Sequence, residues 1–408
     1  MTTAPTKPPE PAAPSPLQPA LQRADCSPQR RQERERLLLE LTAIPTAAGK
    51  EERVMAFLDA WFARQGDRVR VRRDDAGNYL VEQSRGGAGH APLLITAHLD
   101  HPAFVVTARE DAQTLELEFR GGVNDPYFVG TPVEFVGEGA QRARGEIVSL
   151  DAAATPFKKV RVRCADAPWA APGTLARWAL PPAEIRDGHL HTDACDDLAA
   201  AAAALVAFEE LLDAPGCGHV GLLFTVAEEV GFIGAIHAAR SDFVPREARL
   251  LCLENSRSFP HDSPIGAGAI LRVGDRISVF SPAVTNRLAE LFGQAAKESP
   301  AFRWQRKLMP GGACEATSFA SYGYQSTCLC LPLGNYHNMA EIDAVAAGAR
   351  PARIERECIS LADFHSLVTM LHLAAVGMDI PAAETTAQLM ERLYAERSRV
   401  LQRRPAQA

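Results

Sequence analysis

The strongest pattern along this chain is a set of short, uninterrupted apolar runs: Leu93–Ala97, Val220–Val226, Leu250–Leu253 and Thr327–Leu333. Strands that are buried on both faces have this pattern. Helical segments lie between the runs, at Asp197–Leu212, Gly231–Arg240 and Thr285–Lys297. Strands that alternate with helices predict an α/β fold, with a mixed, largely parallel sheet flanked by helices.

Two further patterns define the domain organisation. A helix over Gln29–Leu41, a second over Glu51–Gln65, and a strand pair at Val69–Val71 and Asn78–Glu82 precede the first apolar run. Residues 107–188 instead consist of short strand-like segments and turns without a helical pattern. We therefore expect an α/β domain over residues 29–106 and 189–380, interrupted by a small inserted β domain over residues 107–188.

The two ends of the chain are expected to lie outside this core. Seven prolines within the first 20 residues predict a disordered Pro-rich tail over residues 1–28. Residues 381–408 predict a charged C-terminal helix and tail, with the helix over Ala382–Arg403. The N-terminal segment lacks the charged start and apolar stretch of a secretory signal. A long final helix of the α/β domain is expected over Cys358–Val376.

Composition and charge narrow the class of protein. The chain has 408 residues, with 43 Lys+Arg against 50 Asp+Glu and a net charge of −7, which disfavours a general nucleic-acid binder. The longest apolar run, Leu198–Phe208, is too short and too rich in alanine to cross a bilayer. The nine cysteines form no CxxC pair, so we expect reduced thiols and a cytoplasmic protein.

Polar residues that can bind metal follow the apolar runs. They are His98, Asp100, Asp196, Glu228, Glu229, Glu254 and His337. In α/β sheets, ligands bind at the carboxyl ends of the strands, so these side chains are expected to converge. Imidazoles and carboxylates suit Zn²⁺, Co²⁺ or Mn²⁺, and burying so many carboxylates without a cation is very unfavourable. Two adjacent divalent cations bridged by one carboxylate would resolve the problem.

Spacing within the motifs indicates separate roles. Residues i and i+2 of a strand point the same way, so Asp100 can accept a hydrogen bond from His98 and orient it. Asp196 precedes a helix, where an N-cap is the ordinary interpretation. Glu228 and Glu229 are adjacent, so one can bind metal while the other acts as a general base toward a metal-activated water.

The order of these motifs resembles the co-catalytic dinuclear metallopeptidases, and most of all the tetrahedral (TET) and glutamyl aminopeptidase family. Those proteins carry in order an HxD, a DD, an EEVG, an acidic ligand and a late His. The matching residues are His98-Leu-Asp100, Asp196-Asp197, Glu228-Glu-Val-Gly231, Glu254 and His337, together with Ala103-Phe-Val-Val106 and Gly121-Gly122. The resemblance covers roughly residues 30–378 and implies that the inserted β domain is a β-barrel.

The resemblance also implies residue roles. Asp196 bridges two metal ions, His98 and Glu254 complete one site, and Glu229 and His337 complete the other. Glu228 is the general base, and Asp100 orients His98. The cofactors implied are two divalent ions per subunit, Zn with Co or Mn as alternatives. The partners implied are a peptide substrate and further copies of the chain in a homo-oligomer, with no nucleic acid and no membrane.

The chain departs from the family pattern in places that affect specificity more than metal binding. His101 follows the HxD where an acidic residue is usual, and Glu254 stands where Asp is common. Asn338-Met339 follows the late His in place of Ser-Pro, and an insertion-like stretch runs over Glu341–Arg353. His101 is interpreted as a pocket-wall or surface residue rather than an extra ligand. Glu315 is a weaker candidate for contact with a substrate amine.

These observations predict a metal-dependent exopeptidase, with an aminopeptidase favoured. A carboxypeptidase or an N-acyl amino acid deacylase on the same metal frame is the alternative within the same chemistry. A non-catalytic binding protein with a degenerate site is a further alternative, disfavoured because every residue of the core motifs is present. The sequence does not determine the metal, the preferred substrate side chain or the number of subunits.

Overall fold

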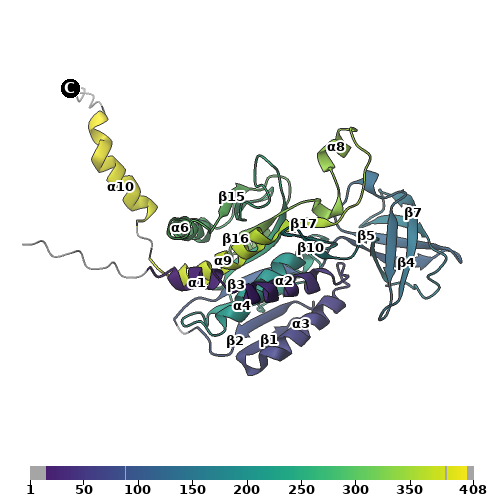
Figure 1. The fold of residues 1–408 in the computed structure, drawn as a ribbon, viewed down its shortest axis with the longest axis horizontal. Helices are drawn as coiled ribbons and strands as arrows, with labels where there is room; N and C mark the ends of the chain where they lie inside the picture. The colour runs from purple at the N-terminus through teal and green to yellow at the C-terminus, as the bar shows by residue number, and fades with distance from the viewer. Residues whose placement is uncertain (1–14, 88, 382–383, 402–408) are drawn as a thin grey trace, which may run out of the picture.

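The computed structural model describes residues 15–87, 89–381 and 384–401. Its centre is an eight-stranded sheet with the strand order β1-β2-β12-β3-β13-β16-β14-β15 (Figure 1). The strand bounds are β1 Val69–Arg73, β2 Tyr79–Gln83, β12 Val220–Thr225, β3 Leu93–His98, β13 Arg249–Arg257, β16 Gln325–Leu333, β14 Ala269–Gly274 and β15 Trp304–Leu308. The four strands predicted from the apolar runs are adjacent and parallel, and β2 and β14 join them antiparallel. The predicted mixed, largely parallel sheet is confirmed.

Helices cover both faces of this sheet. One face packs against α1 Gln18–Ala24, α2 Pro28–Thr42, α3 Glu52–Gln65, α4 Leu198–Leu211, α6 Pro282–Glu298 and α9 Leu361–Gly377. The other face packs against α5 Ile233–Arg240 and α7 Glu315–Ser321. Twelve of the residues of α4 are buried, because its run of alanines lets neighbouring elements approach closely on all sides. The apolar run that begins at Leu198 is thus a central core helix.

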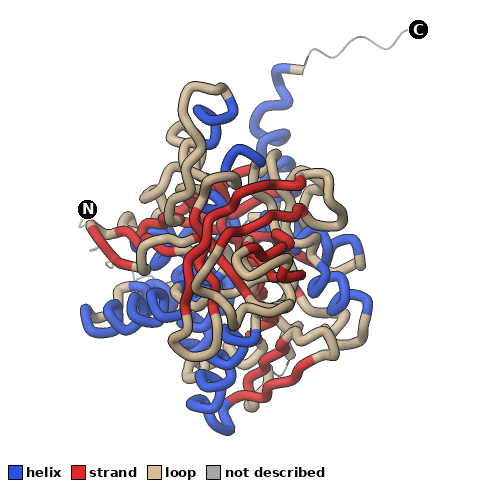
Figure 2. The backbone as a smooth tube through the Cα atoms, turned by 90° about the vertical axis from the view of Figure 1, so that its right-hand side faces the viewer, coloured by secondary structure: helices blue, strands red, loops and turns tan. Residues whose placement is uncertain are grey.

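A closed barrel is inserted between β3 and α4. It contains β4 Ala103–Arg109, β5 Thr114–Arg120, β8 Lys158–Arg163, β7 Arg142–Asp151, β6 Pro132–Val136 and β9 Leu175–Trp178, with β4 and β9 closing the ring. Alternate residues of β5 point into its core, where Phe104, Phe119, Phe128 and Trp178 pack together. Figure 2 views the molecule from the barrel side. The first barrel strand begins at Ala103, ahead of the expected domain boundary at residue 107.

A small three-stranded sheet connects the barrel to the α/β domain. It contains β10 Glu184–Arg186, β11 His189–Thr192 and β17 Glu357–Ser360. β17 takes up the start of the helix that was expected from Cys358, and α9 begins only at Leu361 because Ser360 caps it. The short helix α8 (Ile342–Ala346) belongs to the insertion-like stretch and packs against the barrel core. The described part of the chain also contains short 3-10 helices, η1 Gly66–Arg68, η2 Asp125–Tyr127, η3 Tyr336–Asn338 and η4 Ser398–Val400.

Part of the segment predicted as a disordered N-terminal tail is folded in the structure. Within residues 15–28, Leu17, Ala20 and Leu21 are buried, and α1 packs against α9. This corrects the expectation of a disordered tail up to residue 28, because these apolar residues complete the core. The first 14 residues lie outside the described part of the chain.

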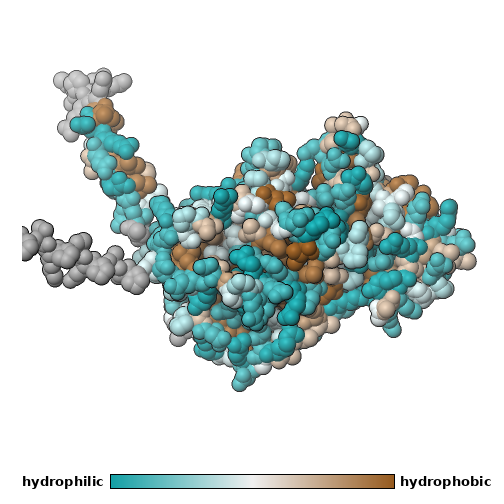
Figure 3. Space-filling view, in the orientation of Figure 1, coloured by the Kyte–Doolittle hydropathy of each residue, from teal (hydrophilic) through white to brown (hydrophobic). Residues whose placement is uncertain are grey.

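The C-terminal helix α10 (Thr386–Arg397) stands apart from the rest of the fold (Figure 1). The space-filling view shows apolar side chains along it (Figure 3). It has no buried residue. Among the described residues, no helix combines the length and the apolar character needed to span a membrane.

Candidate metal centre

The seven predicted site residues meet at the carboxyl ends of the parallel strands. His98 is the last residue of β3, Glu254 lies on β13, and Glu228 and Glu229 follow β12. Asp196 lies in the turn before α4, and His337 lies in η3 after β16. Six of these residues are buried, with relative exposures between 0% for Asp100 and 7% for Glu228 and Glu254, and the side chain of the seventh, Glu229, is 6% exposed. Strand topology therefore brings together residues that are far apart in the sequence.

These side chains form two groups that share one carboxylate. Donor atoms of His98, Asp196 and Glu254 lie within 4.8 Å of one another, as do those of Asp196, Glu229 and His337. Nε2 of His98 is 3.4 Å from Oδ1 of Asp196, and Nε2 of His337 is 3.6 Å from Oδ2 of the same residue. Two ligands of one tetrahedral zinc ion lie about 3.4 Å apart. Each imidazole and the carboxylate oxygen facing it are thus spaced as two ligands of a shared ion.

Unpaired buried oxygens support a cation at this position. Oδ1 of Asp196 and Oε1 of Glu229 are buried without any hydrogen-bond partner. A buried carboxylate oxygen without a donor is very unfavourable, and such groups are rare in native structures. A divalent cation would satisfy both oxygens, and imidazole and carboxylate donors suit zinc, cobalt or manganese. The residues present therefore fit a pair of divalent ions.

The close packing of buried carboxylates and imidazoles shifts the pKa values of the site residues. Burial raises the pKa of Glu228, His98 lowers it, and Asp100 and Glu315 raise it further, so that the net shift is upward. Burial likewise raises the pKa values of Glu229 and Glu254. Burial alone would raise the pKa of Asp196, but His337 and His98 hold it below its usual range. In the absence of cations the imidazoles oppose the charge of these carboxylates, and Arg272 also lowers the pKa of Glu254.

Backbone carbonyls orient both imidazoles. Nδ1 of His337 donates to the carbonyl of Gly122 at 2.6 Å, which leaves Nε2 facing Asp196 and Glu229. Gly122 follows β5, so the inserted barrel supplies this acceptor. Nδ1 of His98 lies 3.1 Å from the carbonyl oxygen of Asp100 and 3.6 Å from its carboxylate. An oriented tautomer with a free Nε2 is typical of metal-ligating histidines.

The loop that carries Glu228 and Glu229 is held by buried side chains. The carboxylate of Asp100 accepts from the N–H groups of Glu228 at 2.9 Å and Glu229 at 3.0 Å. Glu51 accepts from Ala227 at 3.0 Å, and Asn78 accepts from Val226 at 3.1 Å. Four consecutive amides beyond the end of β12 thus have side-chain acceptors.

Burial, together with the charge of Asp100, raises the pKa of Glu51 to about 7. Sequence reasoning missed Glu51 and Asn78, because neither lies beside a recognisable motif. The observed geometry adds a second function for Asp100, which binds the backbone of the Glu228 loop as well as lying beside His98.

Three buried side chains contact the backbone around Asp196, which is the shared carboxylate, and around His337. They are Glu357, His101 and Asn338. Glu357 accepts from the N–H groups of Cys195, Asp196 and His337 at 2.8, 3.0 and 2.8 Å. His101 is 3% exposed, and its Nδ1 donates to the carbonyl of Asp196 at 2.6 Å. His101 is thus neither a surface residue nor, through this nitrogen, a ligand. Sequence reasoning also missed Glu357, which lies beyond the insertion-like stretch.

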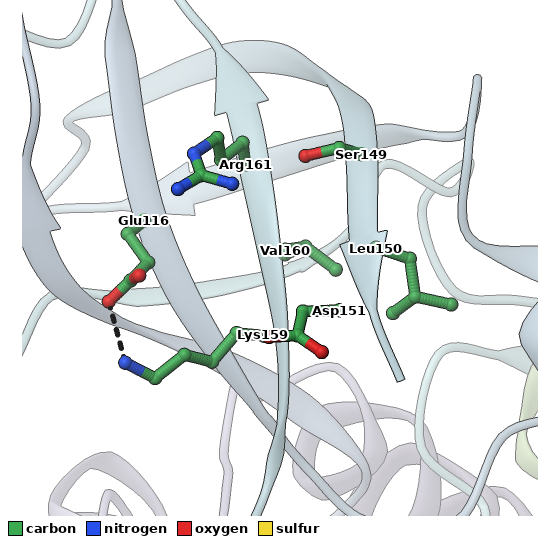
Figure 4. A pocket seen from close by; sticks show the side chains of 7 residues that line it. All are labelled: Glu116, Ser149, Leu150, Asp151, Lys159, Val160 and Arg161. Carbon is green, nitrogen blue, oxygen red and sulfur yellow. Dashed lines mark hydrogen bonds and ion pairs between the residues drawn. The ribbon is translucent and has the colours of Figure 1, made fainter. Parts of the chain in front are cut away.

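Two further features lie outside this set of ligands. Glu315 is 1% exposed, and its Oε2 accepts from Thr96, so it is buried behind the strand end instead of facing solvent. A small pocket of about 130 Å³ lies on the barrel, where Lys159 donates to Glu116 at 2.9 Å (Figure 4). None of the residues lining that pocket belongs to the candidate metal centre.

Comparison with known proteins identifies one family whose sequence pattern matches part of this chain. Residues 165–350 match the M42 glutamyl aminopeptidase family. The matched segment contains Asp196, Glu228, Glu229, Glu254 and His337, and it excludes His98. The resemblance inferred from the motif order is thereby confirmed, as is the prediction that the chain is a hydrolase of the peptidase class. No curated protein is similar enough to this chain to count as a match.

Solved structures share the fold over most of the chain. The TET1 peptidase of Pyrococcus horikoshii is 21% identical, with a TM-score of 0.65, covering 84% of this chain and 99% of its own. The TET aminopeptidase of Thaumarchaeota archaeon SCGC AB-539-E09 is 19% identical, with a TM-score of 0.68 and coverages of 86% and 97%. The aminopeptidase APDkam598 of Desulfurococcus kamchatkensis is 19% identical, with a TM-score of 0.65 and coverages of 86% and 96%. These likenesses confirm the α/β fold with an inserted barrel.

Proposed function

We propose that this protein is a metal-dependent aminopeptidase that releases N-terminal residues from peptides. The observation that carries the proposal is the pair of donor groups that share Asp196, with the carboxylate of Glu228 beside them. The match of residues 165–350 to the glutamyl aminopeptidase family supports this choice of reaction. The named solved structures that share the fold are peptidases or aminopeptidases.

The proposed ligand roles follow the two groups. His98 and Glu254 would hold one divalent ion, Glu229 and His337 would hold the other, and Asp196 would contribute to both. Zinc, cobalt and manganese all accept these ligands, and zinc is the ion we expect. When bound, the ions supply positive charge that polarises the scissile carbonyl and acidifies water. The chain's own part is to keep the imidazole nitrogens and carboxylate oxygens converged in a site from which bulk water is excluded.

Glu228 is the proposed general base. Its Oε2 lies 4.0 Å from Nε2 of His98, so the carboxylate borders the ligands, and Asp100 fixes its backbone. Burial raises the pKa of Glu228 above its ordinary value, which favours a carboxyl group that both accepts and returns a proton. Glu228 would take a proton from the attacking water and pass it to the leaving amine. Asp100 is proposed to position both Glu228 and His98.

One experiment tests this function against its alternatives. The purified protein is loaded with zinc, cobalt or manganese in turn and assayed on aminoacyl-nitroanilides, N-acyl amino acids and peptides with free or blocked N-termini. Hydrolysis only of substrates with a free N-terminal amine supports an aminopeptidase. Hydrolysis of the N-acyl amino acids, or release of C-terminal residues, would favour the alternatives. Metal content below one ion per chain, with no hydrolysis, would favour a non-catalytic binding protein.

Glu228→Gln separates chemistry from metal binding. Gln has nearly the same shape but cannot accept the proton, and Glu228 is not among the proposed ligands. We expect turnover to fall by several orders of magnitude while two ions stay bound. Near-normal turnover in Glu228→Gln would exclude this residue as the base.

Assembly and location complete the proposal. The Pyrococcus horikoshii TET1 peptidase can assemble into a tetrahedron or a large octahedral shell. We propose that this chain also forms a homo-oligomer and acts in the cytoplasm on soluble peptides. Light scattering of the purified protein measures the number of subunits, and a monomer at micromolar concentration would contradict the oligomer.

A further inference from the structure

The ligands of the proposed centre differ in how their backbone is held. His98 and Glu254 lie on β3 and β13, neighbouring strands in the middle of the sheet. Asp196 lies in a turn, and His337 has a left-handed backbone with φ of 53° within η3. Buried amides in such irregular segments need acceptors that secondary structure does not supply. The two halves of the centre therefore depend on different kinds of support.

Glu357 supplies the missing acceptors for the irregular half. One of its oxygens accepts from Cys195 at 2.8 Å and from Asp196 at 3.0 Å, and the other accepts from His337 at 2.8 Å. Its side chain is fully buried. A single carboxylate thus joins the turn before α4 to η3, two segments that lie far apart in the sequence. All three distances are those of good hydrogen bonds, so both segments are held to the same side chain.

His101 and Asn338 reinforce the same connection from another side. Nδ1 of His101 donates to the carbonyl of Asp196 at 2.6 Å, and its other ring nitrogen lies 3.1 Å from Oδ1 of Asn338. Nδ2 of Asn338 donates to the carbonyl of Asp193 at 2.8 Å. Asn338 directly follows His337, so this contact also ties η3 to the turn that holds Asp196. His101 and Asn338 are two positions where the sequence departs from the family pattern, and they contact each other.

We propose that Glu357, supported by His101 and Asn338, is a positioning residue that sets the affinity of the second cation site, formed by Asp196, Glu229 and His337. The inference rests on the proposed dinuclear centre. The network contacts only the backbone that carries Asp196 and His337, whereas His98 and Glu254 are held by the sheet. Asp196 belongs to both sites, but only the second site also depends on His337, so loosening the network at η3 should weaken the second site more than the first.

The structure indicates how Glu357→Gln would act. One oxygen of Glu357 serves two N–H groups and the other serves one. Gln keeps a single oxygen, which is best placed toward Cys195 and Asp196, and its amide group then faces the N–H of His337. Two donors facing each other repel, so η3 is expected to shift while the turn of Asp196 stays in place. Changing the partners around metal ligands typically lowers metal affinity by about 10- to 100-fold.

Asp363 provides a matched control. It is a fully buried carboxylate at the start of α9 that accepts from the N–H groups of Gly266 at 2.6 Å and Gly268 at 2.7 Å. It contacts none of the proposed metal ligands through these bonds. Asp363→Asn therefore reproduces the loss of a buried carboxylate that binds backbone amides, without touching the second site.

The experiment measures bound zinc against free zinc for the metal-free protein and the two variants, by dialysis against buffered zinc and elemental analysis. Cobalt loading adds a visible spectrum that reports the geometry of each site. We expect Glu357→Gln to keep one ion at wild-type affinity, to bind the second at least about tenfold more weakly, and to change the cobalt spectrum. We expect Asp363→Asn to lower the melting temperature while both ions bind as in the wild type.

Several outcomes would overturn the inference. Wild-type affinities for both ions in Glu357→Gln would do so, as would equal weakening of both sites. If Glu357→Gln does not fold, Asn338→Ala gives the same test, because it removes the contacts to His101 and Asp193 next to His337 and should weaken the second ion more than the first. A wild-type protein that binds fewer than two ions would refute the proposed centre itself. If the wild type binds two ions and is fully active while the variants bind both ions as the wild type does, the inference fails and the proposed function stands.

Discussion

Gly121 offers a sharp test of how the inserted barrel supports the metal centre. Its φ is +142°, a backbone conformation that residues with a side chain rarely adopt. A Cβ atom at this position would lie 2.6 Å from Cβ and 2.8 Å from Cα of Pro102. Pro102 follows His101 and leads into β4, so it has little freedom to move away. Gly121→Ala must therefore displace its own segment.

The size of the effect can be worked out from these contacts. Overpacking in a buried place typically costs about 1–3 kcal/mol, and a positive φ costs a residue with a Cβ about 1–2 kcal/mol more. We expect the free energy of unfolding to fall by about 2–5 kcal/mol. The displaced segment also carries the carbonyl of Gly122, which accepts from Nδ1 of His337 at 2.6 Å. Zinc affinity should fall together with stability, because this hydrogen bond orients His337 as a ligand.

Gly122→Ala is the matched control. A Cβ on Gly122 would lie 3.7 Å from Nδ1 of His337, an ordinary van der Waals distance, and its φ is not positive. Urea unfolding of the metal-free proteins gives the change in stability, and a zinc titration gives the change in affinity. Gly121→Ala should lower both the stability and the zinc affinity, and Gly122→Ala should keep both close to the wild-type values. Equal urea midpoints for wild type and Gly121→Ala, or a larger loss in Gly122→Ala, would refute this account.

The remaining predictions concern metal removal, the Glu228 loop and pH. Chelation should abolish peptide hydrolysis and lower the melting temperature, because buried carboxylates then repel one another; an unchanged melting temperature would contradict a cation there. Asp100→Asn should lower kcat by at least about tenfold with little change in KM, since one of the two amides it holds loses its acceptor; a pure KM effect would contradict that role. Burial, with Arg34 and Arg23, lowers the pKa of His372 to about 3, although Glu210 lies 3.2 Å away. A histidine in the unfolded chain titrates near 6.5. The part of the free energy of unfolding that depends on neutral His372 is therefore fully present above pH 6.5. It falls by about 1.4 kcal/mol per pH unit as the pH drops toward 3. His372→Gln should remove this part of the acid sensitivity in urea unfolding; the same slope in both proteins would contradict it.

Much of the fold could be predicted because apolar pattern and topology act together. The four uninterrupted runs became the four adjacent parallel strands, and the metal-type side chains that follow them meet at one edge of the sheet. The alternation of Leu115–Phe119 and its neighbours likewise indicated a sheet of its own, which closes as a barrel. In these places local pattern and tertiary environment agree.

The supporting residues could not be predicted, since their roles depend on contacts far along the chain. Glu51, Asn78 and Glu357 are ordinary polar residues in the sequence and become acceptors only when the fold places them beside irregular backbone. His101 looked like a wall residue because its partner Asn338 lies far away in the sequence. The helix α1 escaped notice because its few apolar residues follow a Pro-rich segment, and it is stabilised by docking on α9.

The position of Glu357 along the chain sets when the centre can be completed during synthesis. The strand that leads to His337 inserts between β13 and β14, both of which are made earlier, and Glu357 follows still later. A ribosome-bound chain that has not yet released Glu357 cannot join the turn of Asp196 to η3, because the connecting carboxylate has not emerged. The proposed second cation site therefore cannot take its final form before residue 357 has been synthesised.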